Sequence, residues 1–98
     1  MKKVSIAALK RMFESNTGRE VIAEFPSMTV VGNCGNTVYP VKTQKRTIKS
    51  VKGNKIWFEK EDGGLTSLQF EAGMYAFMDP GVVEMFLENG SMFVKYIF

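Results

Sequence analysis

Six basic residues and no acidic residue precede the only tryptophan, Trp57, within residues 42–57. The six are Lys42, Lys45, Arg46, Lys49, Lys52 and Lys55. Ammonium and guanidinium groups contact phosphates, and an indole ring stacks on a nucleobase or anchors a partner protein. The pattern therefore predicts a nucleic-acid site of the following residues. In this site the phosphates are contacted by Lys45, Lys49 and Lys55, with Arg46 and Lys52 assisting from the flanks. Trp57 stacks on a base.

Each part of this site has a second interpretation. Lysines on strands also protect a sheet against edge-to-edge aggregation. Tryptophan is highly buried on average, so on the second interpretation Trp57 closes the mouth of a small barrel or lies under an N-terminal helix. The two interpretations differ in which way the indole points.

Other reactive side chains lack the partners that catalysis needs. Cys34 lies among small residues in the segment 32–36, and a catalytic cysteine needs a base or a cationic neighbour to form the thiolate. The chain has no histidine, which excludes histidine-based triads, histidine metal ligands and histidine proton shuttles. The acidic residues near the glycine pair 63–64 are typical of solvated turn charges. We therefore expect neither an enzyme nor a cofactor or metal site.

Length and composition indicate one folded domain covering residues 1–98, with 45% apolar residues. A single cysteine excludes an intrachain disulfide framework and a multi-cysteine zinc site. No apolar run approaches the roughly 20 residues that span a bilayer, so we expect no membrane partner and a cytoplasmic location.

The net charge of +3 hides an asymmetry between the two parts of the chain. Residues 1–58 carry eleven basic and three acidic groups, whereas residues 59–98 carry two basic and seven acidic groups. Such a distribution predicts a surface with one positive and one negative patch.

Residues 42–70 predict three short strands joined by turns at Gly53-Asn54 and at residues 62–64. The length of the first turn decides the register. A two-residue loop places Ile48 and Trp57 on one face, with Val51, Ile56 and Phe58 on the other. A three-residue loop pairs Ile48 with Phe58 and Ser50 with Ile56. It sends the following side chains to the opposite face: Lys45, Thr47, Lys49, Lys55 and Trp57. We favour the three-residue loop, because it turns more lysine to water, although it also turns Val51 outward.

The remaining elements are predicted from the periodicity of apolar residues and from the capping, glycine and proline residues between them. Residues 5–15 predict a helix capped by Ser5, with Ile6, Leu9 and Phe13 on its core face and a stop at Gly18. Strands are expected at residues 19–25, 28–31 and 37–41, the last at an edge because it contains Pro40. The segment 32–36 is expected to be a loop, and residues 74–78 a buried apolar segment.

Two structures compete for residues 82–88. Asp79 and Pro80 could begin a short helix, or Asn89 and Gly90 could form a hairpin turn between two strands. We favour the hairpin, because β-forming residues flank Asn89-Gly90 on both sides. The final segment, residues 92–98, is apolar on both faces and predicts a central strand.

These elements predict an α+β, mainly β fold. An N-terminal helix packs on a small antiparallel, SH3-like barrel or bent sheet of six or seven short strands. In its general character, a tiny single domain without a catalytic set, the chain resembles accessory proteins encoded by bacteriophages and mobile elements. This resemblance, which is one of character and not of motif, implies binding to DNA or disabling a host or defence protein.

Two functions follow. The first is a nucleic-acid-binding module, for DNA or RNA, that uses the basic residues and Trp57. The second is a protein-binding inhibitor or regulator that offers acidic side chains to a positive groove of its partner. Those acidic residues are Glu59, Glu61, Asp62, Glu84 and Glu88, with Glu71 and Asp79 nearby in the same part of the chain.

Overall fold

The chain forms ten strands and one helix in a computed structural model that describes residues Met1–Phe98. The elements of the N-terminal part are β1 (Lys2–Val4), α1 (Ile6–Ser15), β2 (Glu20–Phe25), β3 (Met28–Gly32) and β4 (Gly35–Tyr39). The central elements are β5 (Lys42–Lys52), β6 (Lys55–Lys60) and β7 (Leu65–Gln69). The last three strands are β8 (Tyr75–Asp79), β9 (Val82–Phe86) and β10 (Met92–Ile97).

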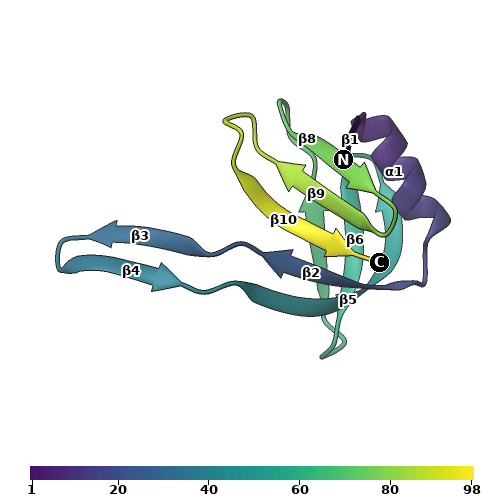
Figure 1. Ribbon diagram of the computed structural model, residues 1–98. Helices are drawn as coiled ribbons and strands as arrows, with labels where there is room; N and C mark the ends of the chain where they lie inside the picture. The colour runs from purple at the N-terminus through teal and green to yellow at the C-terminus, as the bar shows by residue number, and fades with distance from the viewer.

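Eight strands form one antiparallel sheet in the order β1-β8-β9-β10-β2-β5-β6-β7. The sheet bends so that β8, β9 and β10 face the β5–β6 side, with α1 at one flank (Figure 1). The mainly β, α+β class is as predicted. The sheet ends in two free edge strands, β1 and β7, so it is open, and a closed SH3-like barrel is not confirmed. The expected six or seven strands were too few, since eight strands form this sheet alone.

Alternate residues of the strands meet α1 inside the bend. Ser5 caps α1 by accepting a hydrogen bond from the backbone N–H of Ala8 at 3.1 Å, as predicted. Leu9 and Phe13 on the core face of α1 are fully buried. Phe13 stands edge-on to both Phe58 and Tyr96, with ring centroids 5.9 and 5.4 Å away. This aromatic cluster joins the helix to strands from both halves of the sheet.

The turn between β5 and β6 differs from the favoured three-residue loop. Lys52 pairs with Lys55 and Ser50 with Trp57, so the loop has two residues, and Gly53 has a φ of +57° that suits its first position. A bulge then shifts the register, and Ile48 pairs with Phe58 as the three-residue loop predicted. The predicted pair of Ser50 and Ile56 is wrong. Val51, expected outside, packs against the core because of the shorter loop.

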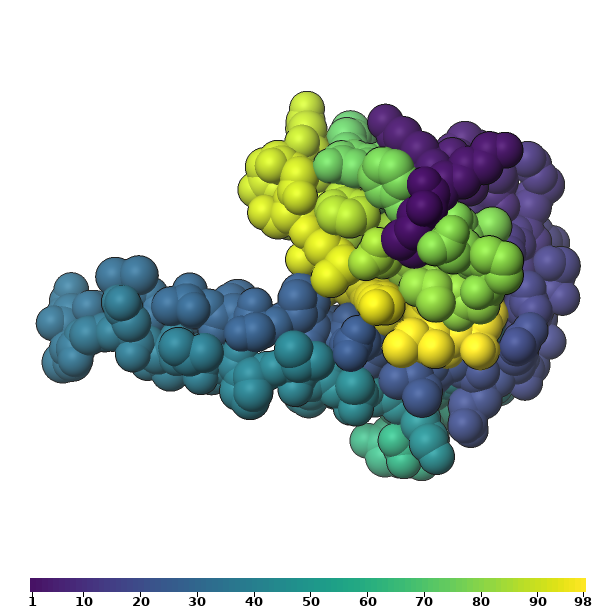
Figure 2. Space-filling model, viewed as in Figure 1, coloured from purple at the N-terminus to yellow at the C-terminus, as the bar shows by residue number.

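Residues between β2 and β5 form a hairpin that leaves the sheet. β3 and β4 pair only with each other, Met28 with Tyr39 through to Gly32 with Gly35. We call residues 26–41 the arm. It projects from the body as a narrow ribbon, as Figures 1 and 2 show. The predicted loop at residues 32–36 is shorter than expected, because only Asn33 and Cys34 lie between the strands, and the strand expected at residues 37–41 begins at Gly35 and ends before Pro40.

The C-terminal segments confirm the hairpin prediction. β9 and β10 pair with each other, and residues 82–86 form a strand and no helix. β10 also pairs with β2, so it is the central, doubly paired strand expected from its apolar faces. Its inward residues Val94 and Tyr96 are buried.

Candidate nucleic-acid interface

Trp57 lies on the outer face of the sheet and is half-buried. Its neighbours along β6, Ile56 and Phe58, are fully buried, so alternation turns the indole outward. Ser50 of β5 and Ser67 of β7 are its cross-strand partners, and both are small. The small partners leave the ring accessible between the two neighbouring strands.

Three lysines surround this ring. Lys55 Nζ stands 5.6 Å from the Trp57 ring centroid, and Lys52 pairs with Lys55 beside the turn. Lys49 is the extra residue of the bulge, and its Nζ lies 3.0 Å from Glu59 Oε2. No carboxylate lies within 4.0 Å of the ammonium group of Lys52 or Lys55. Two of the three positive charges beside the indole are therefore unpaired.

A shallow hollow of about 250 Å³ lies between these side chains. It is lined by Lys49, Ser50, Lys52, Trp57 and Leu65. Leu65, on the edge strand β7, is 61% exposed and gives the hollow a second apolar wall. Sequence reasoning missed Leu65 and Ser50. Ser50 falls on the outer face once the two-residue turn is assigned, whereas the face of Leu65 depends on the pairing of β6 with β7.

Arg46 is not part of this surface. Its side chain turns inward, like that of Ile48 two residues later, and its guanidinium carbon lies 5.1 Å from the Phe25 ring centroid and 5.8 Å from that of Phe58. Arg46 Nη2 donates a hydrogen bond to Gln44 Oε1 at 2.9 Å, and Nε is buried without a partner. A signal was available in the spacing, since Arg46 lies two positions from the buried Ile48, whereas Lys45 and Lys49 lie at odd spacings from it.

Lys45 is exposed but belongs to a different neighbourhood. Its backbone N–H donates to Glu61 Oε1 at 3.4 Å, at the end of the sheet where β6 turns into β7. Lys45 and Glu61 line a small hollow there together with Lys60 and Asp62. The six predicted residues therefore divide into four that gather, namely Lys49, Lys52, Lys55 and Trp57, and two that do not.

The acidic residues of the alternative site occupy two separate places. Glu59, Glu61 and Asp62 lie at the end of β6 and in the turn after it. Glu84 lies on β9 and Glu88 in the following turn, and β10, β2 and β5 separate β9 from β6 in the sheet. In the first group, Glu59 contacts Lys49, and Asp62 Oδ2 lies 3.9 Å from Lys60 Nζ. The predicted acidic surface is therefore divided and partly neutralised.

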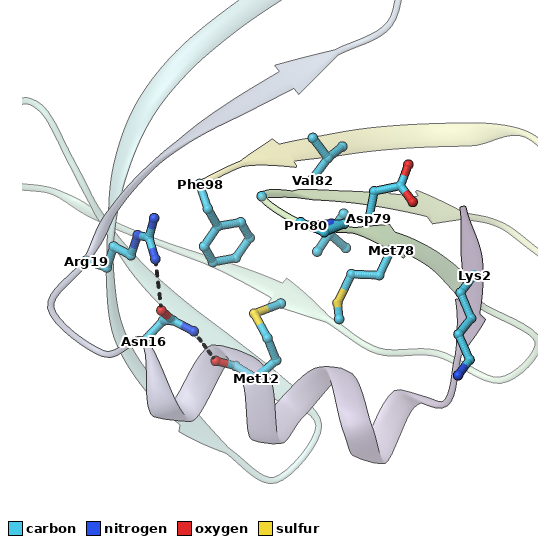
Figure 3. Close-up of a pocket in the computed structure, with 11 residues that line it drawn as sticks. Lys2, Met12, Asn16, Arg19, Met78, Asp79, Pro80, Val82 and Phe98 are labelled. Carbon is cyan, nitrogen blue, oxygen red and sulfur yellow. Dashed lines mark hydrogen bonds between the residues drawn. The ribbon is translucent and has the colours of Figure 1, made fainter.

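A larger hollow of about 530 Å³ lies between α1 and the β8–β9 turn (Figure 3). Met12, Met78, Val82 and Phe98 form apolar walls. At its rim, Arg19 Nη1 donates to Asn16 Oδ1 at 3.4 Å, and Asn16 Nδ2 donates to the Met12 carbonyl at 2.8 Å. The charged residues of its lining are Lys2, Arg19 and Asp79.

Fold and surface together define a mainly β, α+β domain with an aromatic ring among unpaired lysines. No family model, curated protein or solved structure matches the chain. The one helix is ten residues long and too short to cross a bilayer.

Proposed function

We propose that the protein is a non-enzymatic module that binds single-stranded nucleic acid on the outer face of β5 and β6. The observation that supports this most directly is the half-buried indole of Trp57 with the unpaired ammonium groups of Lys52 and Lys55 beside it. A base stacked on an aromatic side chain contributes about 1–3 kcal/mol, and nearby ammonium groups hold the backbone phosphates.

The shape of the surface favours a single strand over a duplex. The hollow is shallow, and Trp57 is the one aromatic residue in its lining. No helix or ribbon of basic residues projects beside it to enter the groove of a duplex. Stacking on Trp57 requires a base that is already free of its pair and neighbours. Single-stranded DNA or RNA presents such bases without the energy needed to open a duplex.

The experiment is a titration of the intrinsic fluorescence with an oligothymidine, a single-stranded RNA and a short duplex. The chain has one tryptophan, so the signal reports on this surface alone. We expect saturable quenching by the single strands. The two unpaired lysines on phosphate give a salt slope near −1.4, so raising salt from about 50 to about 200 mM should weaken binding roughly 7-fold.

Matched single substitutions test the location of the site. Lys52→Gln should weaken binding, whereas Lys60→Gln makes the same change in net charge at the β6–β7 turn and should have little effect. Trp57→Phe removes the reporter, so its binding is followed by the anisotropy of a labelled oligonucleotide. Absence of any fluorescence or anisotropy change at low salt, with micromolar protein, would contradict the proposal.

The second candidate remains a protein-binding inhibitor or regulator of the kind that phages and mobile elements encode, in the cytoplasm of its host. The exposed carboxylate of Asp62 at the tip of the β6–β7 turn favours it, because an exposed acidic turn fits a positive groove. Asp62→Lys together with Glu61→Lys should abolish capture of such a partner and leave oligonucleotide binding in place.

A further inference from the structure

The arm carries no charged residue over its sixteen positions, residues 26–41. Its strands are exposed at every residue. Large apolar side chains lie on both of its faces. Met28, Val30 and Tyr39 share one face, and Val31 and Val38, which are 78% and 64% exposed, share the other. A strand that is apolar on both faces is typical of one covered on both sides.

The arm makes the molecule larger than its mass requires. The radius of gyration is 14.3 Å, against about 12.6 Å for a compact domain of this length. The chain exposes 6221 Å², whereas a compact monomer of 11.0 kDa exposes about 5,600 Å². Each copy therefore exposes roughly 600 Å² that a compact fold would cover.

A ribbon of two strands has two unpaired edges and little stability of its own. An isolated hairpin is marginally stable in water, and proteins blunt free edges with charges, prolines or bulges. Both long edges of the arm lack these devices between Met28 and Tyr39, and its two prolines, Pro26 and Pro40, stand at the base. The backbone N–H and C=O groups along β3 and β4 are therefore open to another strand.

The chemistry of the arm selects among partners. Nucleic acid is disfavoured, because the arm has no cation for phosphate. A lipid surface is disfavoured, because open strand edges and the amides of Asn33 and Asn36 would be buried without partners. A second uncharged ribbon of the same length supplies a strand partner to one edge of each arm, shields the valines beside that edge and brings no like charges together.

We propose that the arm is a self-association element that pairs with the arm of a second copy of this chain. The two ribbons lie antiparallel about a twofold axis and hold the two bodies apart. If each copy covers its excess of roughly 600 Å², the pair buries about 1,200 Å², the lower end of the range for stable interfaces. The proposal is independent of Trp57 and of nucleic-acid binding.

Sedimentation equilibrium of the Cys34→Ser protein tests this directly, because the substitution removes the one cysteine and hence any disulfide-linked pair. We expect the average mass to rise with protein concentration toward twice 11.0 kDa. The double variant Val31→Lys, Val38→Lys should raise the dissociation constant about 100-fold or more, since it brings four like charges together on the two paired arms.

The matched control is Leu65→Lys with Gln69→Lys, which adds the same two charges to the exposed edge strand β7. It should remain dimeric with unchanged affinity. A second variant that replaces residues 27–40 by Asn-Gly should be monomeric at every concentration. A full-length chain that stays monomeric at high micromolar concentration would overturn the proposal, as would a dimer that survives removal of the arm or is lost only in the β7 variant.

Discussion

The fold strongly alters the protonation of the Tyr96 side chain. It is fully buried, its ring stacks on Phe58 with centroids 5.4 Å apart, and Phe13 stands edge-on to it. Burial raises the pKa of Tyr96 to about 12, and the positive charge of Arg46, which lowers this pKa, offsets only part of the effect of burial. The fold therefore favours the neutral phenol.

The raised pKa predicts a loss of stability in alkali. The unfolded chain releases the Tyr96 proton near pH 10, whereas the folded chain keeps it until about pH 12. The contribution of Tyr96 is therefore complete below pH 10 and is lost as the pH rises from about 10 to about 12. The loss amounts to roughly 2–3 kcal/mol, because one pKa unit corresponds to about 1.4 kcal/mol.

Urea unfolding followed by Trp57 fluorescence between pH 8 and about pH 12 measures this loss. Tyr96→Phe should reduce the dependence on pH over that window. Tyr39→Phe, which changes an exposed tyrosine of the arm, should leave it as in the parent protein. Equal slopes for the parent and the Tyr96→Phe protein would show that another group is responsible.

At the same scale, the candidate site could be predicted in part. The basic run and Trp57 were visible in the sequence, and alternation along β6 correctly turns the indole outward. Arg46 was misplaced because it was grouped with its neighbours by charge, whereas its position relative to Ile48 turns it inward onto Phe25. The ion pair of Lys49 with Glu59 depends on the register of two strands, which composition does not determine.

At the scale of elements, the bulge in β5 decides which side chains line the candidate site. Lys49 is the extra residue, and Ile48 and Ser50 on either side of it pair with the consecutive residues Phe58 and Trp57. The turn at Gly53 was readable from the sequence, but nothing in the local pattern marks a bulge four residues earlier. A bulge bends its strand and increases the local twist, so its position depends on the shape of the whole sheet.

This geometry predicts unequal effects for two single-residue deletions. Deleting Lys49 leaves Ile48 opposite Phe58 and Ser50 opposite Trp57 in a regular ladder, so every buried residue keeps its face. The exposed ion pair that is lost contributes little. Deleting Thr47 instead forces either Arg46 or Ile48 to the other face of the sheet, because the side-chain period of a strand is two.

We expect the Lys49 deletion to lower the free energy of unfolding by less than about 2 kcal/mol and the Thr47 deletion by more than about 4 kcal/mol. Urea denaturation of the two proteins gives both values. A Lys49 deletion that is as destabilising as the Thr47 deletion would mean that the bend produced by the bulge, and not the faces of the residues, holds β5 against α1.

At the scale of the whole molecule, the sequence predicted the helix, most strands and the central position of the last strand, because these depend on local periodicity. It left a closed barrel and a bent sheet as alternatives, and it did not predict the arm. Sheet closure depends on strands far apart in the chain, here β1 and β7. The arm is apolar on both faces, as a covered core strand is, and only the lack of a partner in the fold distinguishes its strands.

The arm and the body are therefore expected to be energetically separate. No arm residue is buried, and none contributes to the cluster of fourteen core residues. Replacing residues 27–40 by Asn-Gly keeps Phe25 paired with Lys42 and closes the β2–β5 hairpin with a four-residue loop, Pro26-Asn-Gly-Val41. The shortened protein should fold with an unfolding free energy within about 0.5 kcal/mol of the full-length Val31→Lys, Val38→Lys chain, which is a monomeric reference.

X-ray scattering should give the shortened protein a radius of gyration near 12 Å, the value expected of a compact domain of its length. A loss of several kcal/mol on removing the arm would show that β2 and β5 depend on it for their pairing. In that case the ribbon would be a structural extension of the central hairpin. Unchanged stability would instead indicate that the arm is not retained for folding, because its apolar side chains would then stabilise nothing within their own chain.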